Sequence, residues 1–446
     1  MNPETILKTK VAFTTLGCRV NQYDTQVLRE QMERADFQLV PFEDQADIYV
    51  INTCTVTAAA DAEGRQWVRR AKAQNPGSFV VVTGCLAEDR PQEVAALPGV
   101  DLVVGNREKS TLLEKIVSGS SRFQRPLPAP ARSTPWGHGI SRFDGHQRAT
   151  LKVQDGCGFG CAFCLIPRVR GEMVSRPEAD ILDEGRRLAQ NGVKELVLAG
   201  IQLSSYARDF GKKASEPRLA PVIEKLLAVP GISRVRLSSY AVADFEEALL
   251  PLWKNNRGLC AHLHLPLQSG DPGMLKAMRR PYSLDQYRER VFQVREAAPE
   301  VGLTGDVIAG FHGETEEAFQ NTLNRIREFD YVDFHPFPYS DRPGTPGEAM
   351  TPKVPSAVIR RRMKTLMDLK TNCLKRSAEK TVGKTYRVIA ERHNDRQEAG
   401  LTGQGLRVLF PKAQGQLGRE LEVRVEGFEE GRAQARVLSG PEDGAI

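Results

Sequence analysis

The stretch Asp155-Gly-Cys-Gly-Phe-Gly-Cys-Ala-Phe-Cys164 carries three cysteines in the spacing C-x3-C-x2-C: Cys157, Cys161 and Cys164. Three thiolates this close along the chain can surround one inorganic core when the loop between them curls tightly. The alternating glycines of the stretch permit the unusual backbone angles that such a curl needs. The stretch therefore predicts a metal-binding loop.

The number of thiols favours an iron-sulfur cluster over a structural zinc ion. A structural zinc site takes four protein ligands, and neither a fourth Cys nor a His lies nearby in the sequence. Three ligands to a [4Fe-4S] cluster leave one iron free to bind a substrate-like molecule, and Phe163 could pack beside it. The alternatives are a zinc site completed from elsewhere in the fold and three thiols packed as small hydrophobic groups.

The residues around this loop predict a partial, open (β/α)6 barrel over 146–380, which includes a basic helical extension. Helical segments such as 177–191 and 314–329 separate six candidate strands, which begin near Ala149, Glu195, Arg234, Ala261, Thr304 and Val332. This alternation is typical of a parallel sheet with helical crossovers. The site of such a barrel is expected at the carboxyl ends of its strands.

Residues 1–118 predict a separate α/β domain with a doubly wound parallel sheet. Short β-branched runs indicate strands at 10–16, 47–53, 79–83 and 101–104, with helices at 22–35 and 58–73 and a shorter helical segment around 91–96. Parallel strands joined by helical crossovers account for this order.

A second group of three cysteines follows the strands of this first domain: Cys18, Cys54 and Cys85. The intervals between them match one βα unit each. Because the carboxyl ends of neighbouring parallel strands face one crevice, the three thiols are expected to converge and could hold a second cluster. The alternative is three buried free cysteines at strand ends.

Two segments complete the predicted organisation. Residues 119–145 are rich in Ser, Pro and Gly without a sustained period, which is typical of a linker. Residues 381–446 contain short strands separated by glycines and predict a small β-barrel. Barrels of this kind often hold RNA, although the pattern by itself does not imply RNA.

Length and composition indicate a soluble globular protein. With 446 residues, 40% of them hydrophobic and 26% charged, the chain suits two or three domains and not a disordered segment. No stretch has the length of a membrane span, and residues 1–10 lack the apolar region of a signal peptide. We therefore expect a cytoplasmic protein without a membrane partner, in which reduced thiols serve as metal ligands more readily than as disulfides.

The positive charge is concentrated in one segment. The 62 Lys and Arg residues exceed the 56 Asp and Glu residues by 6, and residues 356–380 alone hold eight basic against two acidic residues. A confined field of this sign can attract phosphates, which makes Arg360, Arg361, Arg362 and Lys364 candidate RNA-binding residues. The alternative is a solvated helix face.

The cysteine loop resembles the signature of the radical S-adenosylmethionine (SAM) superfamily. Further motifs resemble the methylthiotransferase family, most closely its branch that modifies N6-threonylcarbamoyladenosine in tRNA: Leu16-Gly-Cys-Arg-Val-Asn21, Ile51-Asn-Thr-Cys-Thr-Val-Thr57, Thr83-Gly-Cys85, Ile166-Pro-Arg-Val-Arg-Gly171, Ser175-Arg176, His262-Leu-His-Leu-Pro-Leu-Gln-Ser-Gly270 and Phe337-Pro-Tyr-Ser340. The resemblance covers about Lys10 to Leu438, and it identifies the terminal barrel as similar to the TRAM domain, an RNA-binding module.

The resemblance implies two [4Fe-4S] clusters and two uses of SAM. Cys157, Cys161 and Cys164 would bind the cluster whose open iron takes the amino acid end of SAM. Reductive cleavage of SAM would then yield a 5′-deoxyadenosyl radical. The trio of the first domain would hold the second cluster, which carries the sulfur that another SAM methylates. The same carry-over makes Gly200 and Gln268 candidate SAM contacts beside Phe163.

The sequence also departs from the family pattern. Gly310-Phe-His-Gly-Glu-Thr315 has His312 where proline is usual, and Leu237-Ser-Ser-Tyr-Ala241 lacks the usual acidic-proline pair. Both departures bear on substrate or SAM contacts at strand ends. Four histidines are candidate ligands: His262, His264, His312 and His335. A lone His near a strand is, however, more often structural. Cys260 and Cys373 lack metal-type neighbours and are expected to be structural.

The expected function is insertion of a methylthio group at C2 of N6-threonylcarbamoyladenosine at position 37 of tRNA. Its partners would be tRNA, an external electron donor and an undefined sulfur donor. Alternatives are methylthiolation of N6-isopentenyladenosine in tRNA or of a ribosomal protein aspartate, and, from another class, a non-catalytic iron-sulfur RNA-binding protein. A cobalamin-dependent radical methylase is disfavoured, because its Asp-x-His-x-x-Gly loop is absent from the sequence.

Overall fold

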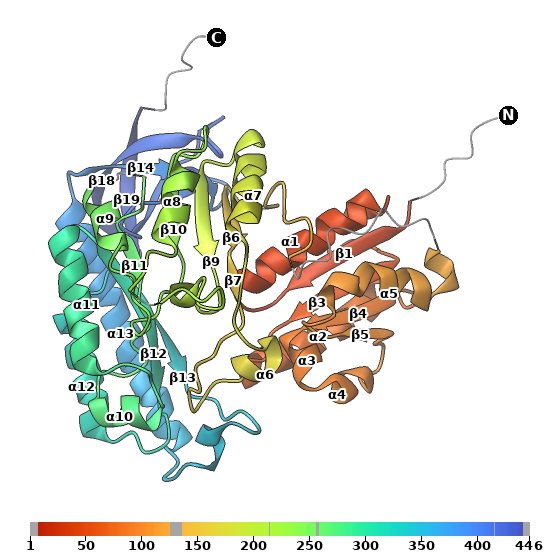
Figure 1. Ribbon diagram of the computed structural model, residues 1–446, viewed down its shortest axis with the longest axis horizontal. Coiled ribbons are helices and arrows are strands. Elements are labelled where there is room, and N and C mark those ends of the chain that lie inside the picture. The colour runs from red at the N-terminus through yellow and green to blue at the C-terminus, as the bar shows by residue number, and fades with distance from the viewer. Residues whose placement is uncertain (1–7, 125–135, 214, 256–257, 414, 440–446) are drawn as a thin grey trace. The chain divides into compact units, whose positions relative to one another are not determined.

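A computed structural model describes residues 8–124, 136–213, 215–255, 258–413 and 415–439 (Figure 1). The chain divides into two compact units: Met1–Ser141, Cys164–Glu172 and Ser340–Pro343 form the first, and Arg142–Phe163, Met173–Tyr339 and Gly344–Ile446 form the second. Residues 125–135 of the predicted linker lie outside the described residues, as do 1–7 and 440–446 of the predicted terminal domains. The predicted bounds of the four segments stay predictions.

The first unit is built on five parallel strands in the order β2-β1-β3-β4-β5. These are β1 (Lys10–Thr15), β2 (Gln38–Val40), β3 (Ile48–Thr53), β4 (Phe79–Gly84) and β5 (Leu102–Val104). Its helices are α1 (Arg19–Arg34), α2 (Ala58–Gln74), α3 (Cys85–Asp89), α4 (Pro91–Ala95), α5 (Leu112–Gly119) and α6 (Ile166–Arg170). The predicted doubly wound sheet is confirmed, with β2 as an additional edge strand.

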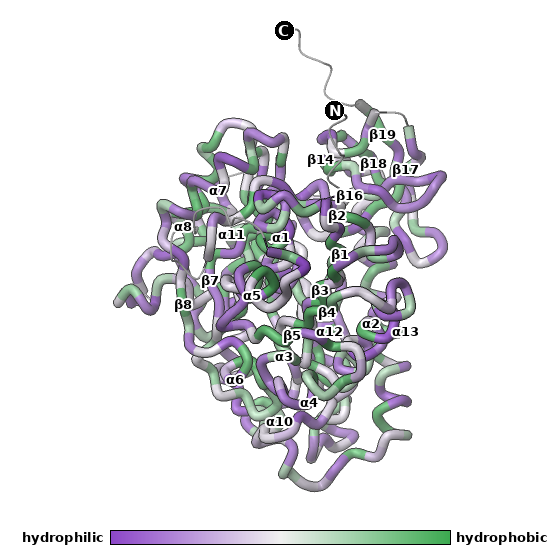
Figure 2. Tube along the Cα trace, turned by 90° about the vertical axis from the view of Figure 1, so that its right-hand side faces the viewer, coloured by the Kyte–Doolittle hydropathy of each residue, from purple (hydrophilic) through white to green (hydrophobic). Residues whose placement is uncertain are grey.

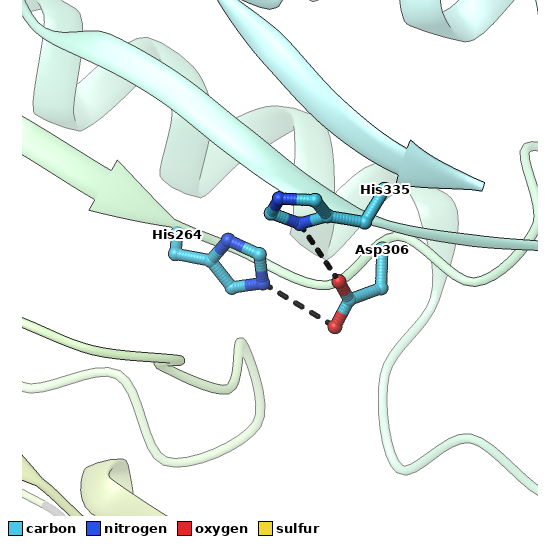
Figure 3. A group of neighbouring side chains, drawn as sticks. All are labelled: His264, Asp306 and His335. Atoms are coloured by element: carbon cyan, nitrogen blue, oxygen red, sulfur yellow. Dashed lines mark ion pairs between the residues drawn. The ribbon is translucent and has the colours of Figure 1, made fainter. Parts of the chain in front are cut away.

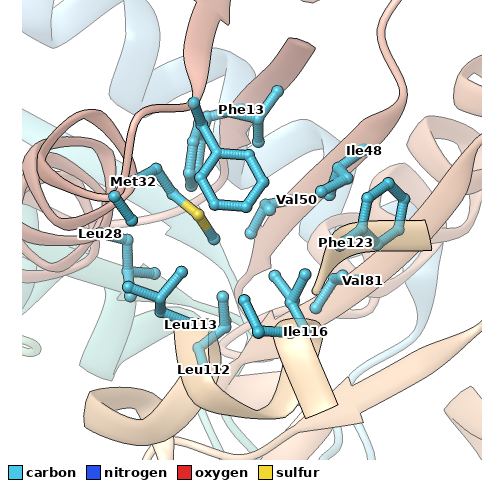
Figure 4. Packing of buried hydrophobic residues seen from close by; sticks show 14 of the residues in the cluster. Phe13, Leu28, Met32, Ile48, Val50, Val81, Leu112, Leu113, Ile116 and Phe123 are labelled. Carbon is cyan, nitrogen blue, oxygen red and sulfur yellow. The ribbon is translucent and has the colours of Figure 1, made fainter. Parts of the chain in front are cut away.

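Helices cover both faces of this sheet, because each face carries apolar side chains. Leu28 and Met32 of α1 and Ile116 of α5 pack on one face, as Figure 4 shows. Val68 of α2 and Leu86 of α3 belong to the cluster on the other face. In Figure 2 the traces of β3 and β4 are largely green, as expected of strands buried on both sides.

The core of the second unit is a row of six parallel strands. Two three-stranded sheets, β6-β9-β10 and β11-β12-β13, are joined by single bridges between Val235 and Leu259 and between Ser239 and His264. The strands are β6 (Arg148–Lys152), β9 (Glu195–Ala199), β10 (Arg234–Leu237), β11 (His262–His264), β12 (Gly302–Ala309) and β13 (Asp333–Pro338). No pairing joins β6 to β13 within the described ranges, so the predicted open six-stranded barrel is confirmed.

Helices fill the crossovers of this barrel: α7 (Glu178–Gln190), α8 (Ala220–Leu227), α9 (Leu249–Asn255), α10 (Pro272–Ala277), α11 (Leu284–Ala297) and α12 (Glu316–Glu328). The helix α13 (Ser356–Thr381) follows the last barrel strand. A short antiparallel pair, β7 (Gln154–Asp155) and β8 (Val174–Ser175), flanks the cysteine loop. None of the described helices combines the length and the apolar character needed to cross a membrane.

The C-terminal residues form a curled, mixed six-stranded sheet, a half-barrel, in the order β14-β18-β19-β17-β16-β15. Its strands are β14 (Thr385–Ile389), β15 (Glu391–Arg392), β16 (Gln397–Leu401), β17 (Arg407–Pro411), β18 (Glu420–Glu429) and β19 (Arg432–Ser439). Ala378 of α13 belongs to the same buried cluster as Val388 and Val423 of this sheet. The basic helix therefore continues directly into the core of the β domain.

Candidate functional site

The three cysteines of the first unit lie at the carboxyl edge of three adjacent strands. Cys18 is the N-cap of α1 after β1, Cys54 follows β3 directly, and Cys85 opens α3 after β4. The pairs Thr15–Asn52 and Thr53–Gly84 keep these strand ends level. The strand order reverses between β1 and β3, where open α/β sheets form their binding crevice.

The structure brings these three thiols together. The pKa of Cys54 is raised to about 12 by burial and by the nearby thiols of Cys85 and Cys18, against the N–H groups of Val56 and Thr55, which lower it. Cys54 and Cys85 are buried, whereas Cys18 is exposed. Thiolates that lie close together repel one another. A cation or cationic cluster bound between them removes this repulsion, so such a group of thiols is suited to bind one.

Two glycines make the close approach possible. Gly17 and Gly84 both have φ +95°, in the region that favours glycine. A Cβ on Gly17 would lie 2.9 Å from the Cys54 Sγ, and a Cβ on Gly84 would lie 2.4 Å from the carbonyl oxygen of Thr53. Any side chain at these positions would push the strand ends apart.

Two polar residues that were not predicted from the sequence, the buried Asn21 and the half-buried Asn106, hold the cysteine turns. Asn21 Nδ2 donates to the carbonyl oxygens of Leu16 (2.8 Å) and Thr53 (3.0 Å). Asn106 Nδ2 donates to the Cys85 Sγ at 3.4 Å. Asn21 is part of the Leu16-Gly-Cys-Arg-Val-Asn21 motif. The only sequence feature that could have indicated Asn106 is its position just after the strand β5.

A charged network adjoins Cys54. Asp61 accepts hydrogen bonds from Thr55 Oγ1 (2.7 Å) and from Arg342 Nη2 (2.6 Å), and both Asp61 and Arg342 are buried. Arg342 Nη2 also donates to Thr55 Oγ1 at 2.9 Å. The network fixes residues 54–61 by charge-assisted bonds that water does not reach.

In the second unit, Cys157 and Cys161 lie in the loop after β6 and the short strand β7, in a polar setting. The Cys157 thiol donates to Gln202 Oε1 at 2.9 Å, and Arg280 Nη1 donates to the Cys161 Sγ at 3.1 Å. Burial and Cys161 raise the pKa of Cys157, whereas the Phe159 N–H and Arg280 lower it. The two thiols are therefore close to each other and to one cation.

Cys164 belongs to the first unit, and the sequence spacing ties it to Cys157 and Cys161. Its Sγ accepts a hydrogen bond from the Ile166 N–H at 3.4 Å, at the start of α6. Backbone N–H donors of this kind stabilise a thiolate.

Arg280 is held in place from its other side by Tyr282. The guanidinium lies 4.9 Å from the Tyr282 ring centroid. The Tyr282 hydroxyl donates to the carbonyl oxygens of Pro266 (2.9 Å) and Leu267 (3.0 Å), in the turn after β11. Burial lowers the pKa of Arg280, but Tyr282 and Cys161 together raise it above its usual value, so the side chain stays cationic.

The three predicted SAM contacts have different surroundings. Phe163 packs against a buried cluster that contains Phe311, whose ring centroid lies 6.4 Å away. Gly200 directly follows β9, and a Cβ there would lie 2.8 Å from Gln154 Oε1. Gln268 has φ +60° and continues the pairing of β11 with β12 by its bridge to Val307.

Gln154 explains the need for a glycine at position 200. Its Oε1 accepts from the Gln202 N–H at 2.8 Å, and its Nε2 donates to the carbonyl oxygen of Gly156 at 2.8 Å. One buried amide thus joins the turn after β9 to the start of the cysteine loop.

The basic residues of α13 are mostly paired within the protein. Arg362 is 3% exposed and its Nη1 lies 2.7 Å from Glu314 Oε2, so its charge is not available to RNA. Arg361 pairs with Glu316, and Lys370 with Asp333. Arg360 and Lys364 are exposed and form no ion pair with any residue in the described ranges.

Two of the positions that depart from the family pattern, His312 and Tyr240, are buried. His312 is 6% exposed and its ring lies 4.9 Å from that of Tyr339. Tyr240 is buried, and burial raises its pKa above its usual range. Cys260 and Cys373 are buried and burial raises the pKa of both thiols, in keeping with the structural role expected of them.

Two family profiles match the chain. Residues 10–105 match the family described as uncharacterized protein family UPF0004, and residues 151–326 match the radical SAM superfamily. A solved structure of the radical SAM methyltransferase TsrM from Kitasatospora setae has a TM-score of 0.54 at 16% identity and covers 77% of both chains. At this identity the likeness establishes the fold alone.

Similar curated proteins match over nearly the full length. The threonylcarbamoyladenosine tRNA methylthiotransferase MtaB of Bacillus subtilis is 34% identical over 430 residues, which are 93% of this chain and 93% of that protein. The protein of the same name from Aquifex aeolicus is 39% identical over 389 residues, 86% of this chain and 93% of the relative. The chain therefore belongs to the radical SAM methylthiotransferase family, and it is an enzyme of that family.

Proposed function

We propose that this enzyme inserts a methylthio group at C2 of N6-threonylcarbamoyladenosine at position 37 of tRNA. The observation that carries the proposal is the convergence of Cys18, Cys54 and Cys85 at one sheet edge, in a chain that also has the three-cysteine loop. Relatives named for this modification, matched over about nine tenths of the chain, support the choice of nucleoside.

The radical SAM domain implies a [4Fe-4S] cluster and SAM. We assign the cluster ligands to Cys157, Cys161 and Cys164. The donor set fits, because soft thiolates are the ligands that such clusters take and Arg280 compensates part of the negative charge. When bound, the cluster and SAM supply the one-electron chemistry that can activate an inert C–H bond.

We assign the ligands of a second [4Fe-4S] cluster to Cys18, Cys54 and Cys85. The mutual electrostatic effect of these thiols on Cys54 supports a shared cationic ligand, and the exposed Cys18 leaves an approach from solvent. Gly17 and Gly84 keep the crevice free of side chains, while Asn21 holds two of the turns. A cluster with three protein ligands retains one iron position for sulfur.

The chain's own residues position SAM in this proposal. Gly200 leaves room for Gln154, which ties the cysteine loop to the turn after β9. Gln268 and Phe163 are the other candidate SAM contacts. An external reductant and a sulfur donor must be supplied by other molecules, since no side chain of the described residues can deliver electrons or inorganic sulfur catalytically.

For tRNA we assign phosphate contacts to Arg360, Arg361 and Lys364 of α13 and to the C-terminal half-barrel. Arg362, which was grouped with these residues from sequence, is excluded because Glu314 neutralises it in the interior. Arg360, Arg361 and Lys364 lie on the N-terminal half of the helix, whose C-terminal half packs into the sheet.

Mass spectrometry of tRNA nucleosides tests the proposal. A strain lacking this gene should accumulate N6-threonylcarbamoyladenosine without its 2-methylthio form, and the wild-type gene should restore that form. A variant with Cys157 changed to alanine should not restore it. Loss of 2-methylthio-N6-isopentenyladenosine, or of a methylthiolated ribosomal protein with tRNA unchanged, would instead identify one of the other substrates.

A further inference from the structure

Three neighbouring strands of the barrel bring together two histidines and one carboxylate. His264 ends β11, Asp306 lies in the middle of β12, and His335 lies opposite Asp306 on β13. Figure 3 shows the two rings directed at the same carboxylate. The His264 Nε2 lies 3.3 Å from Asp306 Oδ2, and the His335 Nδ1 lies 3.4 Å from Asp306 Oδ1.

The surroundings orient this group. Thr304 Oγ1 lies 3.0 Å from the Nδ1 of His264, so the other ring nitrogen is directed at Asp306. The Thr304 hydroxyl therefore fixes the imidazole of His264 from behind, as the outer ligands of metal sites commonly do.

The geometry matches a mononuclear metal site. The ligand atoms of the three residues all lie within 4.8 Å of one another. Ligands about 2.1 Å from one metal ion are separated by about 3.0–3.4 Å when they are neighbours, on the bond lengths typical of imidazole and carboxylate. The two nitrogen-oxygen distances fall in that range, each to a different oxygen of Asp306, and side-chain rotation must bring the remaining ligand atoms, which lie within 4.8 Å of one another, to the same separation.

We propose that His264, Asp306 and His335 bind one divalent transition-metal ion through two imidazole nitrogens and a carboxylate oxygen. Two histidines and one carboxylate are typical of sites for Fe²⁺, Mn²⁺ or Zn²⁺ that keep further positions open. The set contains no thiol, so it is chemically distinct from both cysteine trios. An open position can take an oxygen ligand, and the N–H of Gln268, a candidate SAM contact, donates to the backbone carbonyl of Asp306 at 2.8 Å.

Manganese binding tests this site without interference from the thiols. Mn²⁺ prefers nitrogen and oxygen ligands, so the anaerobic, cluster-loaded chain can be titrated with Mn²⁺ while the signal of the free ion is followed by electron paramagnetic resonance. Oxidised [4Fe-4S] clusters are silent in this measurement. We expect one tight Mn²⁺ site per chain, and we expect His335→Gln and Asp306→Asn to weaken binding at least tenfold.

The matched control is Asp333→Asn, because Asp333 lies on the same strand as His335 but pairs with Lys370. It should retain the wild-type affinity. His335 is 51% exposed in its side chain, so His335→Gln is expected to fold even where Asp306→Asn does not. Absence of a tight Mn²⁺ site in the wild-type chain, or equal binding by wild type and His335→Gln, would overturn the proposal and leave the group as hydrogen-bonded structural residues.

Discussion

At the scale of single residues, Arg280 is the cation that bears most directly on the proposed SAM-binding cluster. Its Nη1 donates to the Cys161 Sγ at 3.1 Å. Positive charge and N–H···S bonds stabilise the more negative, reduced form of a cluster. We therefore expect Arg280→Gln to lower the midpoint potential of this cluster by about 60 mV or more, the equivalent of a tenfold change for one electron.

A redox titration followed by electron paramagnetic resonance measures this shift directly. The variant with Cys18, Cys54 and Cys85 changed to alanine isolates the signal. The neighbouring Arg279 is exposed, so Arg279→Gln is the matched control and should leave the potential unchanged. Equal midpoint potentials for Arg280→Gln and the parent protein would show that Arg280 does not tune the potential of this cluster.

Gly84 is the residue at which the backbone of the first unit tolerates least change. It has φ +95°, and an added Cβ would lie 2.4 Å from the carbonyl oxygen of Thr53. Gly84→Ala should therefore lower the stability of the chain by about 1–3 kcal/mol. Gly192→Ala has a similar φ of +86° with open space around it and should cost less. Thermal unfolding of both variants separates the two effects, because Gly192→Ala introduces backbone strain alone and Gly84→Ala adds a steric clash. Equal losses of stability would show that the close approach of Gly84 to the Thr53 carbonyl oxygen is unimportant.

A site residue could be predicted from the sequence where it directly follows a recognisable strand. Cys18, Cys54 and Cys85 each follow an apolar, β-branched run, so their places at the strand ends could be predicted. Asp306 could not, because its two partners lie 42 and 29 residues away and only strand register brings them together. Arg362 carried an overlooked signal: together with Leu366, Leu369 and Cys373 it occupies the buried stripe of α13.

At the scale of elements, the strongly periodic or β-branched segments were predicted and the weakly patterned ones were missed. Ile48–Thr53 and Phe79–Gly84 are apolar runs between helices and were expected as strands. The short edge strand β2 and the strand β16, with the sequence Gln-Glu-Ala-Gly-Leu, were not, because neither contains a sustained β-branched pattern. Pairing with neighbouring strands determines them.

The helix α13 has an exposed face, to which we assign phosphate binding, and a buried face, and substitutions on the two faces should have different effects. Changing Arg360, Arg361 and Lys364 to Gln should weaken tRNA binding and reduce the slope of log affinity against log salt by about one for each phosphate that is no longer neutralised. Arg362→Gln should instead destabilise the fold, because it leaves the buried Glu314 without its partner. Binding measured at several salt concentrations, with thermal unfolding in parallel, separates the two effects.

The outcomes that contradict this assignment are distinct. An unchanged salt slope in the triple variant would return Arg360, Arg361 and Lys364 to an ordinary solvated helix face. A flattened slope with full stability in Arg362→Gln would mean that this residue leaves Glu314 to reach RNA.

At the scale of the whole molecule, we propose two chemical roles for the two cysteine trios. The first trio lies at the edge of the N-terminal sheet, and Cys157 and Cys161 lie in the loop that follows the first barrel strand and β7. Full loading should give about eight irons per chain on this ligand count. Changing either trio to alanine should remove about half of the iron, whereas changing Cys260 and Cys373, which are buried and distant from both motifs in sequence, should remove none.

The two trio variants should also fail differently, because only the barrel trio is assigned to SAM cleavage. The chain without Cys18, Cys54 and Cys85 should still form 5′-deoxyadenosine with a reductant, since its barrel ligands, Arg280 and Gln202 are intact. It should form no methylthiolated nucleoside, because the thiols proposed to hold the sulfur-bearing cluster are gone. The chain without Cys157, Cys161 and Cys164 should lose both products. Liquid chromatography with mass spectrometry quantifies both in one reaction, and methylthiolated tRNA from the first variant would show that the sulfur is delivered without the N-terminal crevice.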